Sequence, residues 1–124
     1  MSEDKKKVIK KSKIEVEVGL NEDQVPTSMK WRAEDNPEAQ DWQESKGMLV
    51  SFFDKESRDT FRIDLWTTEM QVMEMDRMVF HTLKGLSESY AKATGNSELA
   101  GQMQQFALYF GEKTEVIKPK KEGN

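Results

Sequence analysis

Apolar and polar positions along the chain follow two periods, and the change from one to the other separates a strand region from a helix region. Apolar residues recur at every second position in residues 13–20, 27–33 and 60–66, and they occupy both faces of residues 47–54. These patterns predict three half-buried strands and one strand covered on both sides. Beyond the fourth strand the apolar spacing becomes three and four residues, which is typical of one helix face. The stretch 61–90 contains this change, and the rest of the chain is organised around it.

Two helices are predicted after the strands. The first carries an apolar stripe, is capped by Thr67 or Thr68 at the turn into it, and runs to about Ala93. Gly95 and Asn96 separate it from a second helix that ends near Lys113. The two stripes consist of Val72, Met75, Val79, Leu83, Leu86 and Tyr90, and of Leu99, Met103, Phe106 and Phe110.

The element order predicts an α+β fold, in which a four-stranded antiparallel meander sheet is followed by two C-terminal helices packed on one face (β-β-β-β-α-α). A single α+β domain is expected over residues 13–113. Charged residues without apolar periodicity predict a disordered basic tail over 1–12 and a disordered Lys-rich tail over 114–124. Boundaries of this kind are uncertain by roughly two to four residues.

Charge supports a hairpin between the first two strands. Glu15 and Glu17 share one face of the first strand, and Lys30 and Arg32 share one face of the second. Opposite charges on neighbouring strands stabilise a pairing by roughly 0.2–1 kcal/mol each. The hairpin is therefore better supported than either strand alone.

Residues 34–46 form either a short helix or a long acidic loop. Asn36 followed by Pro37 is a favourable helix start, and Gly47 is a suitable end. Trp42 is the one large apolar residue of the segment, and it either covers an open edge of the core or contacts a partner. The sequence favours the first role for Trp42.

Composition excludes several classes of site. The 124 residues contain no cysteine and one histidine, which excludes thiolate and multi-histidine metal sites. No apolar run approaches the roughly 20 residues that span a bilayer, so we expect no integral membrane segment and a cytoplasmic location. The net charge is −4, but residues 14–112 hold 19 acidic and 9 basic residues, so the flanks are basic. Because no aromatic residues interleave with the N-terminal lysines, we expect a solvated tail and no nucleic-acid partner.

The chain carries no phosphate-binding, nucleophile-elbow or zinc-protease motif, and we expect no enzyme, metal or cofactor. Arg62 and Asp64 share a strand face and are either a polar binding site or, more simply, surface charges. His81 lies opposite the apolar stripe of its helix, which predicts a surface histidine.

The sequence best supports a role in binding other proteins. With one sheet face covered by the helices, the other face around Leu49, Phe53 and Trp66 has no predicted intramolecular cover, and an exposed apolar patch marks an interface. A methionine cluster follows, and methionine recurs at adaptable apolar surfaces. Met75 fits the core, so the predicted partner-binding residues are Leu49, Phe53, Trp66, Met70, Met73 and Met78.

Specific motifs resemble the gliding motility-associated GldC family of Bacteroidetes. RIDLWTTEM at residues 62–70 carries the resemblance, supported by IEVEV at 14–18, WRAED at 31–35, FHTL at 80–83 and YFGEK at 109–113. The resemblance runs from about residue 11 to about residue 117. It implies a non-catalytic cytoplasmic accessory protein of gliding motility, linked to type IX secretion, with gliding or secretion components as protein partners and no cofactor.

A second hypothesis comes from element order. Four meander strands followed by two helices on an acidic chain are similar in order to the export chaperone SecB, whose relatives assemble into oligomers and hold unfolded clients. The sequence itself shows no match to SecB, and element order does not establish function. A SecB-like holdase for exported proteins, with a homo-oligomeric assembly, is therefore the alternative to a dedicated accessory protein.

Overall fold

The structure is a computed structural model that describes residues 5–118. Residues 1–4 and 119–124 lie outside the described part, and so do those portions of the two predicted tails. Contacts between Cα atoms divide the chain into two compact units, the first ending at Met70 and the second beginning at Gln71. The single domain predicted over residues 13–113 stays a prediction.

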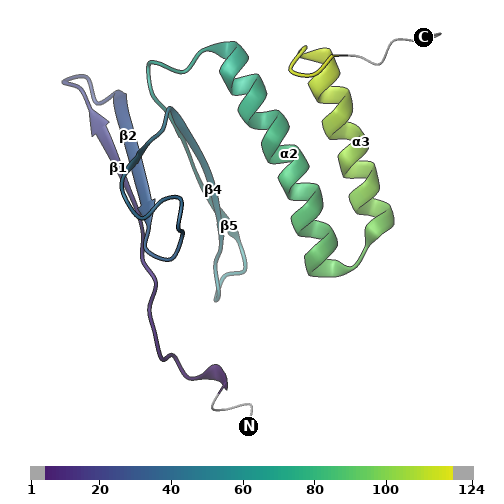
Figure 1. Ribbon diagram of the computed structural model, residues 1–124, viewed down its shortest axis with the longest axis horizontal. Helices are drawn as coiled ribbons and strands as arrows, with labels where there is room; N and C mark the ends of the chain where they lie inside the picture. The colour runs from purple at the N-terminus through teal and green to yellow at the C-terminus, as the bar shows by residue number, and fades with distance from the viewer. Residues whose placement is uncertain (1–4, 119–124) are drawn as a thin grey trace. The chain divides into compact units, whose positions relative to one another are not determined.

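The elements follow the predicted α+β order, with antiparallel strands first and two helices last (Figure 1). The strands are β1 (Ile14–Leu20), β2 (Pro26–Ala33), β3 (Gln43–Glu44), β4 (Gly47–Phe53) and β5 (Thr60–Trp66). The helices are α2 (Val72–Thr94) and α3 (Ser97–Lys113).

The charge-matched hairpin of β1 and β2 is confirmed. Glu15 lies opposite Arg32 and Glu17 lies opposite Lys30 in the antiparallel register. The Nε of Arg32 donates to Oε1 of Glu15 at 3.0 Å, and Lys30 Nζ lies 3.9 Å from Glu17 Oε1. The apolar alternate residues of both strands consequently share the opposite face of this sheet.

The prediction of one four-stranded sheet is wrong, because the strands form a three-stranded sheet, β1-β2-β3, and a separate two-stranded sheet, β4-β5. The short β3 occupies the edge of β2 that β4 was expected to take. The chain then turns at Ser45, whose hydroxyl donates to the carbonyl of Gly47 at 2.7 Å. The sheets remain linked at one end, where the N–H of Thr68, just after β5, donates to the carbonyl of Pro26 in β2 at 3.1 Å.

Residues 34–46 are a loop that ends in β3, so the helical alternative is wrong. The side chain of Asn36 accepts the N–H of Glu38 at 2.9 Å, and this turn replaces the expected first turn of a helix. Trp42 lies over the charged face of β2, with its ring 4.5 Å from Arg32 Cζ and 4.8 Å from Lys30 Nζ. The half-buried indole therefore covers the cations that pair with β1.

The second unit is a hairpin of α2 and α3. Its seam contains the buried Phe80 and Ser87 of α2 and the buried Ala100, Ala107 and Gly111 of α3. On an α-helix, Phe80 lies about 100° from the centre of the predicted apolar stripe. The α3-facing side of α2 therefore includes Phe80, which is not part of the predicted stripe. The small α3 residues allow Phe80 to enter the seam.

The cap of α2 also differs from the prediction. The helix begins after Gln71, whose N–H donates to the carboxylate of Glu74 at 3.1 Å, and neither Thr67 nor Thr68 caps it. Thr67 instead is 1% exposed, and its N–H donates to Lys46 O across the ends of β4 and β5. Thr67 therefore closes the β4-β5 hairpin of the first unit.

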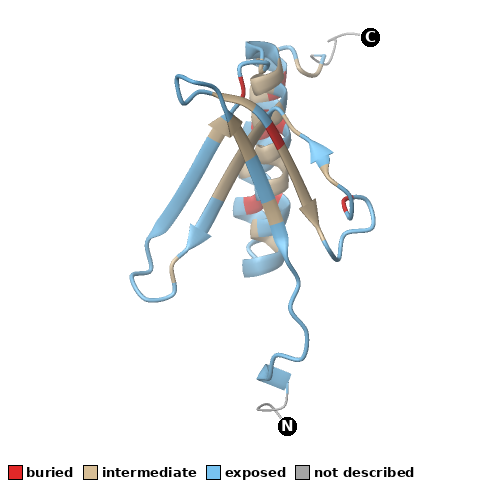
Figure 2. Cartoon of the chain, turned by 90° about the vertical axis from the view of Figure 1, so that its left-hand side faces the viewer, coloured by how far each residue is buried: buried red, intermediate tan, exposed pale blue. Residues whose placement is uncertain are grey.

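Few large side chains of the described residues are buried (Figure 2). The buried apolar residues are Met29, Ala39, Phe80, Ala100 and Ala107. Many exposed apolar side chains belong to β4 and β5, where Phe52, Phe53, Phe61, Ile63 and Trp66 are each more than 40% exposed. Because burial of such side chains is a main source of stability, this hairpin is the first candidate for a contact surface.

Candidate protein-interaction surface

The register of β4 and β5 assigns their residues to two faces. Residues directly opposite each other share a face, and so do residues two apart along a strand. The first face, named the apolar face here, consists of the cross-strand pairs Met48–Leu65, Val50–Ile63 and Phe52–Phe61. The second face, named the mixed face here, carries Leu49, Ser51, Phe53, Arg62, Asp64 and Trp66.

The apolar face is the more hydrophobic of the two, and it is substantially exposed toward the turn of the hairpin. The exposed fraction is 58% for Phe52, 57% for Phe61 and 45% for Ile63. A two-stranded hairpin is marginally stable alone in water, so faces of this kind require cover. These three residues were missing from the predicted site, although the alternation of Phe61 and Ile63 with polar residues is visible in the sequence.

The mixed face contains the predicted patch, which the structure shows to be interrupted. Phe53 lies at one end and Trp66 at the other, with exposed fractions of 69% and 53%, whereas Leu49 is half-buried. Between these ends, Arg62 donates to both carboxylate oxygens of Asp64, Nη2 to Oδ1 at 2.8 Å and Nε to Oδ2 at 3.2 Å. Leu49, Phe53 and Trp66 therefore share a face as predicted, but a polar network crosses it.

The polar network on the mixed face extends onto β4. Arg62 donates to the hydroxyl of Ser51, which lies directly opposite it in the register. Arg62 and Asp64 were interpreted as surface charges, and their side chains are 50% and 37% exposed. Their mutual bidentate pairing leaves a planar, charge-balanced arrangement in the middle of β5.

An apolar hollow of about 310 Å³ lies within the first unit, between the β1-β2 hairpin and β4. Its lining includes Ile14 and Trp31 on one side and Met48, Leu49 and Val50 on the other. Ile14 is 74% exposed, so the hollow opens to solvent on the side of β1. Leu49 is the one predicted site residue that lines this hollow.

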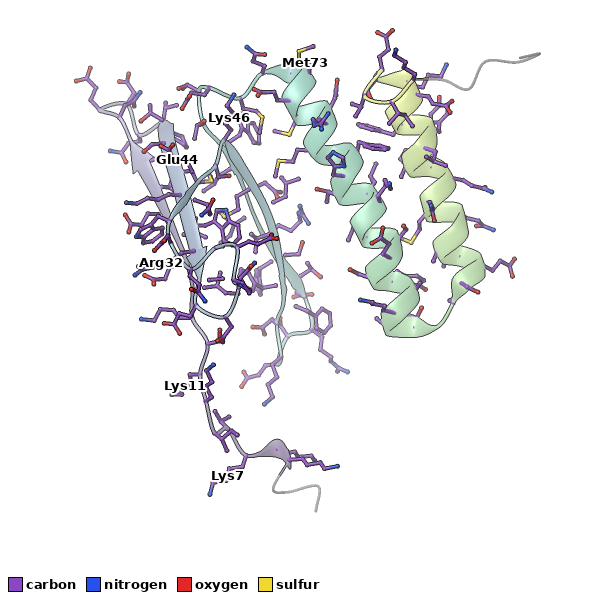
Figure 3. All side chains as sticks on the ribbon, viewed as in Figure 1. Lys7, Lys11, Arg32, Glu44, Lys46 and Met73 are labelled. Carbon is purple, nitrogen blue, oxygen red and sulfur yellow. The ribbon has the colours of Figure 1, made fainter. Side chains whose placement is uncertain are left out.

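The predicted methionines are divided between the two units. Met70 is half-buried at the end of the first unit, whereas Met73 and Met78 belong to α2 in the second. Met73 lies in the first turn of α2 (Figure 3), is 71% exposed, and lines a hollow with Arg77 and Val116. Met78 is half-buried and lies about 140° from Met73 around an α-helix. The partner-binding role of all three stays a prediction.

The described residues offer few chemically distinctive groups. They contain no cluster of three or more His, Cys, Asp or Glu side chains placed to hold a metal ion. Within residues 5–118, no helix combines the length and the hydrophobicity of a membrane span. His81 is exposed on α2, as predicted, with its ring 5.3 Å from that of Phe80.

The basic N-terminal segment contacts the acidic body at Asp35. Lys7 follows a short helical turn, and Lys11 lies on the strand-free segment that leads to β1 (Figure 3). Lys10 Nζ donates to Asp35 Oδ1 at 2.8 Å. This hydrogen bond is the main cause of two pKa shifts. It lowers the pKa of Asp35 below its ordinary value and raises the pKa of Lys10 above its ordinary value. The Lys10–Asp35 contact agrees with a basic tail that binds the acidic body of its own chain, and it gives no indication of an anion site in the tail.

Comparison with known proteins identifies a family. The model of the family described as gliding motility-associated protein GldC-like matches residues 26–116, a span from β2 to the end of α3 that includes the β4-β5 hairpin. Neither the curated proteins nor the solved structures contain a match to this chain. Because the matched span covers well over half of the 124 residues, the chain belongs to the gliding motility-associated GldC-like family.

Proposed function

We propose that this protein is a non-catalytic, cytoplasmic accessory component of gliding motility that acts through protein–protein contacts at the β4-β5 hairpin. The contacted proteins are gliding components linked to type IX secretion. The proposal joins the family membership of the chain to the surface that the hairpin presents.

The exposed aromatic side chains of β4 and β5 are the observation that carries this proposal. Phe52, Phe53 and Phe61 are each more than 55% exposed near the turn of the hairpin. Aromatic side chains are enriched at the energetically important positions of interfaces, where they gain most from losing water. The Asp54–Asp59 turn fixes this end, since Asp54 N–H donates to Asp59 O and Arg58 N–H donates to Asp54 O.

Affinity purification of the tagged full chain from its native host, read by quantitative mass spectrometry, tests the proposal. We expect a few near-stoichiometric gliding or secretion components with the wild-type chain and their loss with Phe53→Glu. Because Phe53 is 69% exposed, the substitution is expected to change the free energy of unfolding by about 0.5 kcal/mol or less.

Phe106→Glu is the matched control, because Phe106 is 54% exposed but lies on α3 in the second unit. The control variant is expected to retain the components that Phe53→Glu loses. An unchanged set of proteins with Phe53→Glu would sink the proposal. Loss of the folded signal in circular dichroism would show instead that Phe53 belongs to the core.

The apolar hollow favours a second candidate function, a SecB-like holdase for exported proteins. Its lining by Trp31, Met48 and Val50, with an opening at Ile14, suits an apolar side chain of an extended client. In this case purification recovers a broad set of unfolded envelope proteins in place of a few components.

Suppression of aggregation separates the two candidates. A holdase keeps a denatured model protein in solution, and Val50→Asp should abolish that effect, because it places a charge in the hollow. Phe53→Glu serves as the control, since Phe53 does not line the hollow. A wild-type chain without any effect on aggregation would exclude the holdase.

A further inference from the structure

Strand β5 lies at an edge of its sheet. Among the described residues it pairs only with β4, and β4 alone of the two strands lines the apolar hollow. An exposed strand edge presents a row of unpaired N–H and C=O groups that can template a further strand. The backbone and side-chain pattern of β5 indicates which strand would fit this edge.

Two hydrogen bonds at the ends of the hairpin show which backbone groups of β5 point toward β4 and which point outward. Thr67 N–H donates to Lys46 O and Asp54 N–H donates to Asp59 O, and each is a directly opposite pair in the extended register. Hydrogen-bonded and non-bonded pairs alternate along an antiparallel ladder. Phe61, Ile63 and Leu65 therefore bond toward β4, and the groups directed outward are those of Thr60, Arg62, Asp64 and Trp66.

The side-chain pattern of β5 is complementary to itself. In an antiparallel pairing of two copies about a twofold axis at Ile63, Arg62 of each copy lies opposite Asp64 of the other. Phe61 lies opposite Leu65 in the same register, and the two Ile63 side chains meet on the apolar face. In this register the backbone N–H and C=O groups of Arg62 in one copy exchange hydrogen bonds with those of Asp64 in the other. These backbone groups are among the ones that point outward from the hairpin.

Neighbouring twofold registers are less favourable. An axis at Arg62 places two guanidinium groups opposite each other, and an axis at Asp64 does the same with two carboxylates. Like charges directly opposite on paired strands are destabilising. Axes at Phe61 and Leu65, which the outward backbone groups also permit, leave Arg62 opposite Thr60 or Asp64 opposite Trp66 and pair fewer residues of β5. Charge and strand overlap together therefore favour the register centred on Ile63.

β1, a full-length edge strand of the three-stranded sheet, provides a contrast. In β1, twofold axes at Glu15, Val16 and Glu17 all place glutamates opposite glutamates. These carboxylates also pair with Arg32 and Lys30 within the chain. Charge therefore protects the edge of β1 against self-pairing but not the edge of β5.

We propose that two copies of this chain associate through β5, in antiparallel register about Ile63, to form a continuous four-stranded sheet β4-β5-β5-β4. In the dimer, Arg62 of each chain pairs with Asp64 of the other chain, either in place of or in addition to the Asp64 of its own chain. The apolar faces of the two hairpins join into one surface. This inference goes beyond the proposed function and does not depend on the identity of any gliding partner.

Charge reversal tests the register, with the mass of the full chain in solution measured by analytical ultracentrifugation. Arg62→Asp and Asp64→Arg should each weaken dimerisation by about tenfold or more, because each places like charges opposite each other twice. The double variant should dimerise again. An equimolar mixture of the two single variants should form a heterodimer. One variant carries two acidic residues at positions 62 and 64 and the other carries two basic residues there. Opposite charges therefore meet in both cross-strand pairs of the heterodimer, whereas like charges meet in each homodimer.

Cysteine cross-linking tests the centre of the interface without relying on charge. The chain has no cysteine, so Ile63→Cys introduces one thiol that can form a disulfide only between chains. Cβ atoms of directly opposite residues lie about 4.5–5.5 Å apart, near the separation that a disulfide requires. Mild oxidation of Ile63→Cys should yield a covalent dimer.

Val16→Cys is the matched control, because Val16 is β-branched, central in its edge strand, and 42% exposed against 45% for Ile63. It should remain uncrosslinked under the same oxidation. A wild-type chain that stays monomeric up to its solubility limit would overturn the proposal. It would equally be overturned if the wild type and both charge reversals associated alike, or if Val16→Cys cross-linked as well as Ile63→Cys.

Discussion

Gly111 of α3 faces the ring of Phe80 on α2 at a separation that leaves no room for a side chain. A Cβ built on Gly111 would lie 2.6 Å from Cε1 and 2.8 Å from Cδ1 of Phe80, and 3.0 Å from Cγ1 of Ile117. The Ile117 N–H also donates to the Gly111 carbonyl at 3.2 Å. One glycine therefore receives the largest buried side chain of the helical hairpin and the segment that follows α3.

Gly111→Ala should destabilise the full chain. The added methyl group overpacks the seam against Phe80, at a cost of about 1–3 kcal/mol in the free energy of unfolding. Urea unfolding followed by circular dichroism measures the difference. Gly101→Ala is the control, because a Cβ there meets nothing within 4 Å, and it should stabilise the helix by about 0.5–1 kcal/mol. Equal effects of the two substitutions would contradict the packing described for Phe80.

Asn96 caps α3 and should be sensitive to loss of its acceptor. Its Oδ1 accepts the N–H of Leu99 at 3.1 Å, which satisfies one of the free donors of the first turn. Asn96→Ala should lower the free energy of unfolding by about 0.5–2 kcal/mol, whereas Asn96→Asp keeps an acceptor and should preserve stability. If alanine and aspartate behaved alike in thermal unfolding, the cap would have no energetic role.

Asp54 couples the β4-β5 turn to pH. The backbone N–H of Ser57, at 2.9 Å from Oδ2, is the main cause that lowers the pKa of Asp54 below its ordinary value of 3.8. The Ser57 hydroxyl and the N–H of Glu56 act in the same direction. Because the folded-state pKa is lowered, this carboxylate contributes stability that is fully present above pH 3.8 and is lost as the pH falls through the folded value.

Titration of the Asp54 carboxyl by NMR should give a midpoint below 3.8, and Asp54→Asn should remove this part of the acid dependence of unfolding. Asparagine keeps an oxygen acceptor for the turn but does not titrate. A midpoint at or above the ordinary value would mean that the Ser57 and Glu56 contacts are not made in solution.

Local features of the fold could be predicted from the sequence because they depend on neighbouring residues. The alternation of Glu15 and Glu17 with apolar positions predicted both β1 and its charge pairs, and Gly95 with Asn96 predicted the break between α2 and α3. The two helices and the antiparallel strands follow from the same periodicities.

The arrangement of the strands could not be predicted, because it depends on which segment pairs with β2. Residues 43–44 take that edge, and the turn at Ser45 then directs β4 away from it. The same choice decides which side chains are exposed. Phe53 and Trp66 were expected to be exposed, but the exposure of Phe52 and Phe61 depends on the hairpin forming a sheet of its own.

Gliding of the native host carrying Phe53→Glu in the chromosomal copy tests the central claim most directly. With protein levels equal to wild type, we expect cell movement reduced to the level of a strain that lacks the protein, while the Phe106→Glu strain glides normally. Normal gliding of the Phe53→Glu strain would contradict the claim that the exposed end of the β4-β5 hairpin is the surface through which this protein acts.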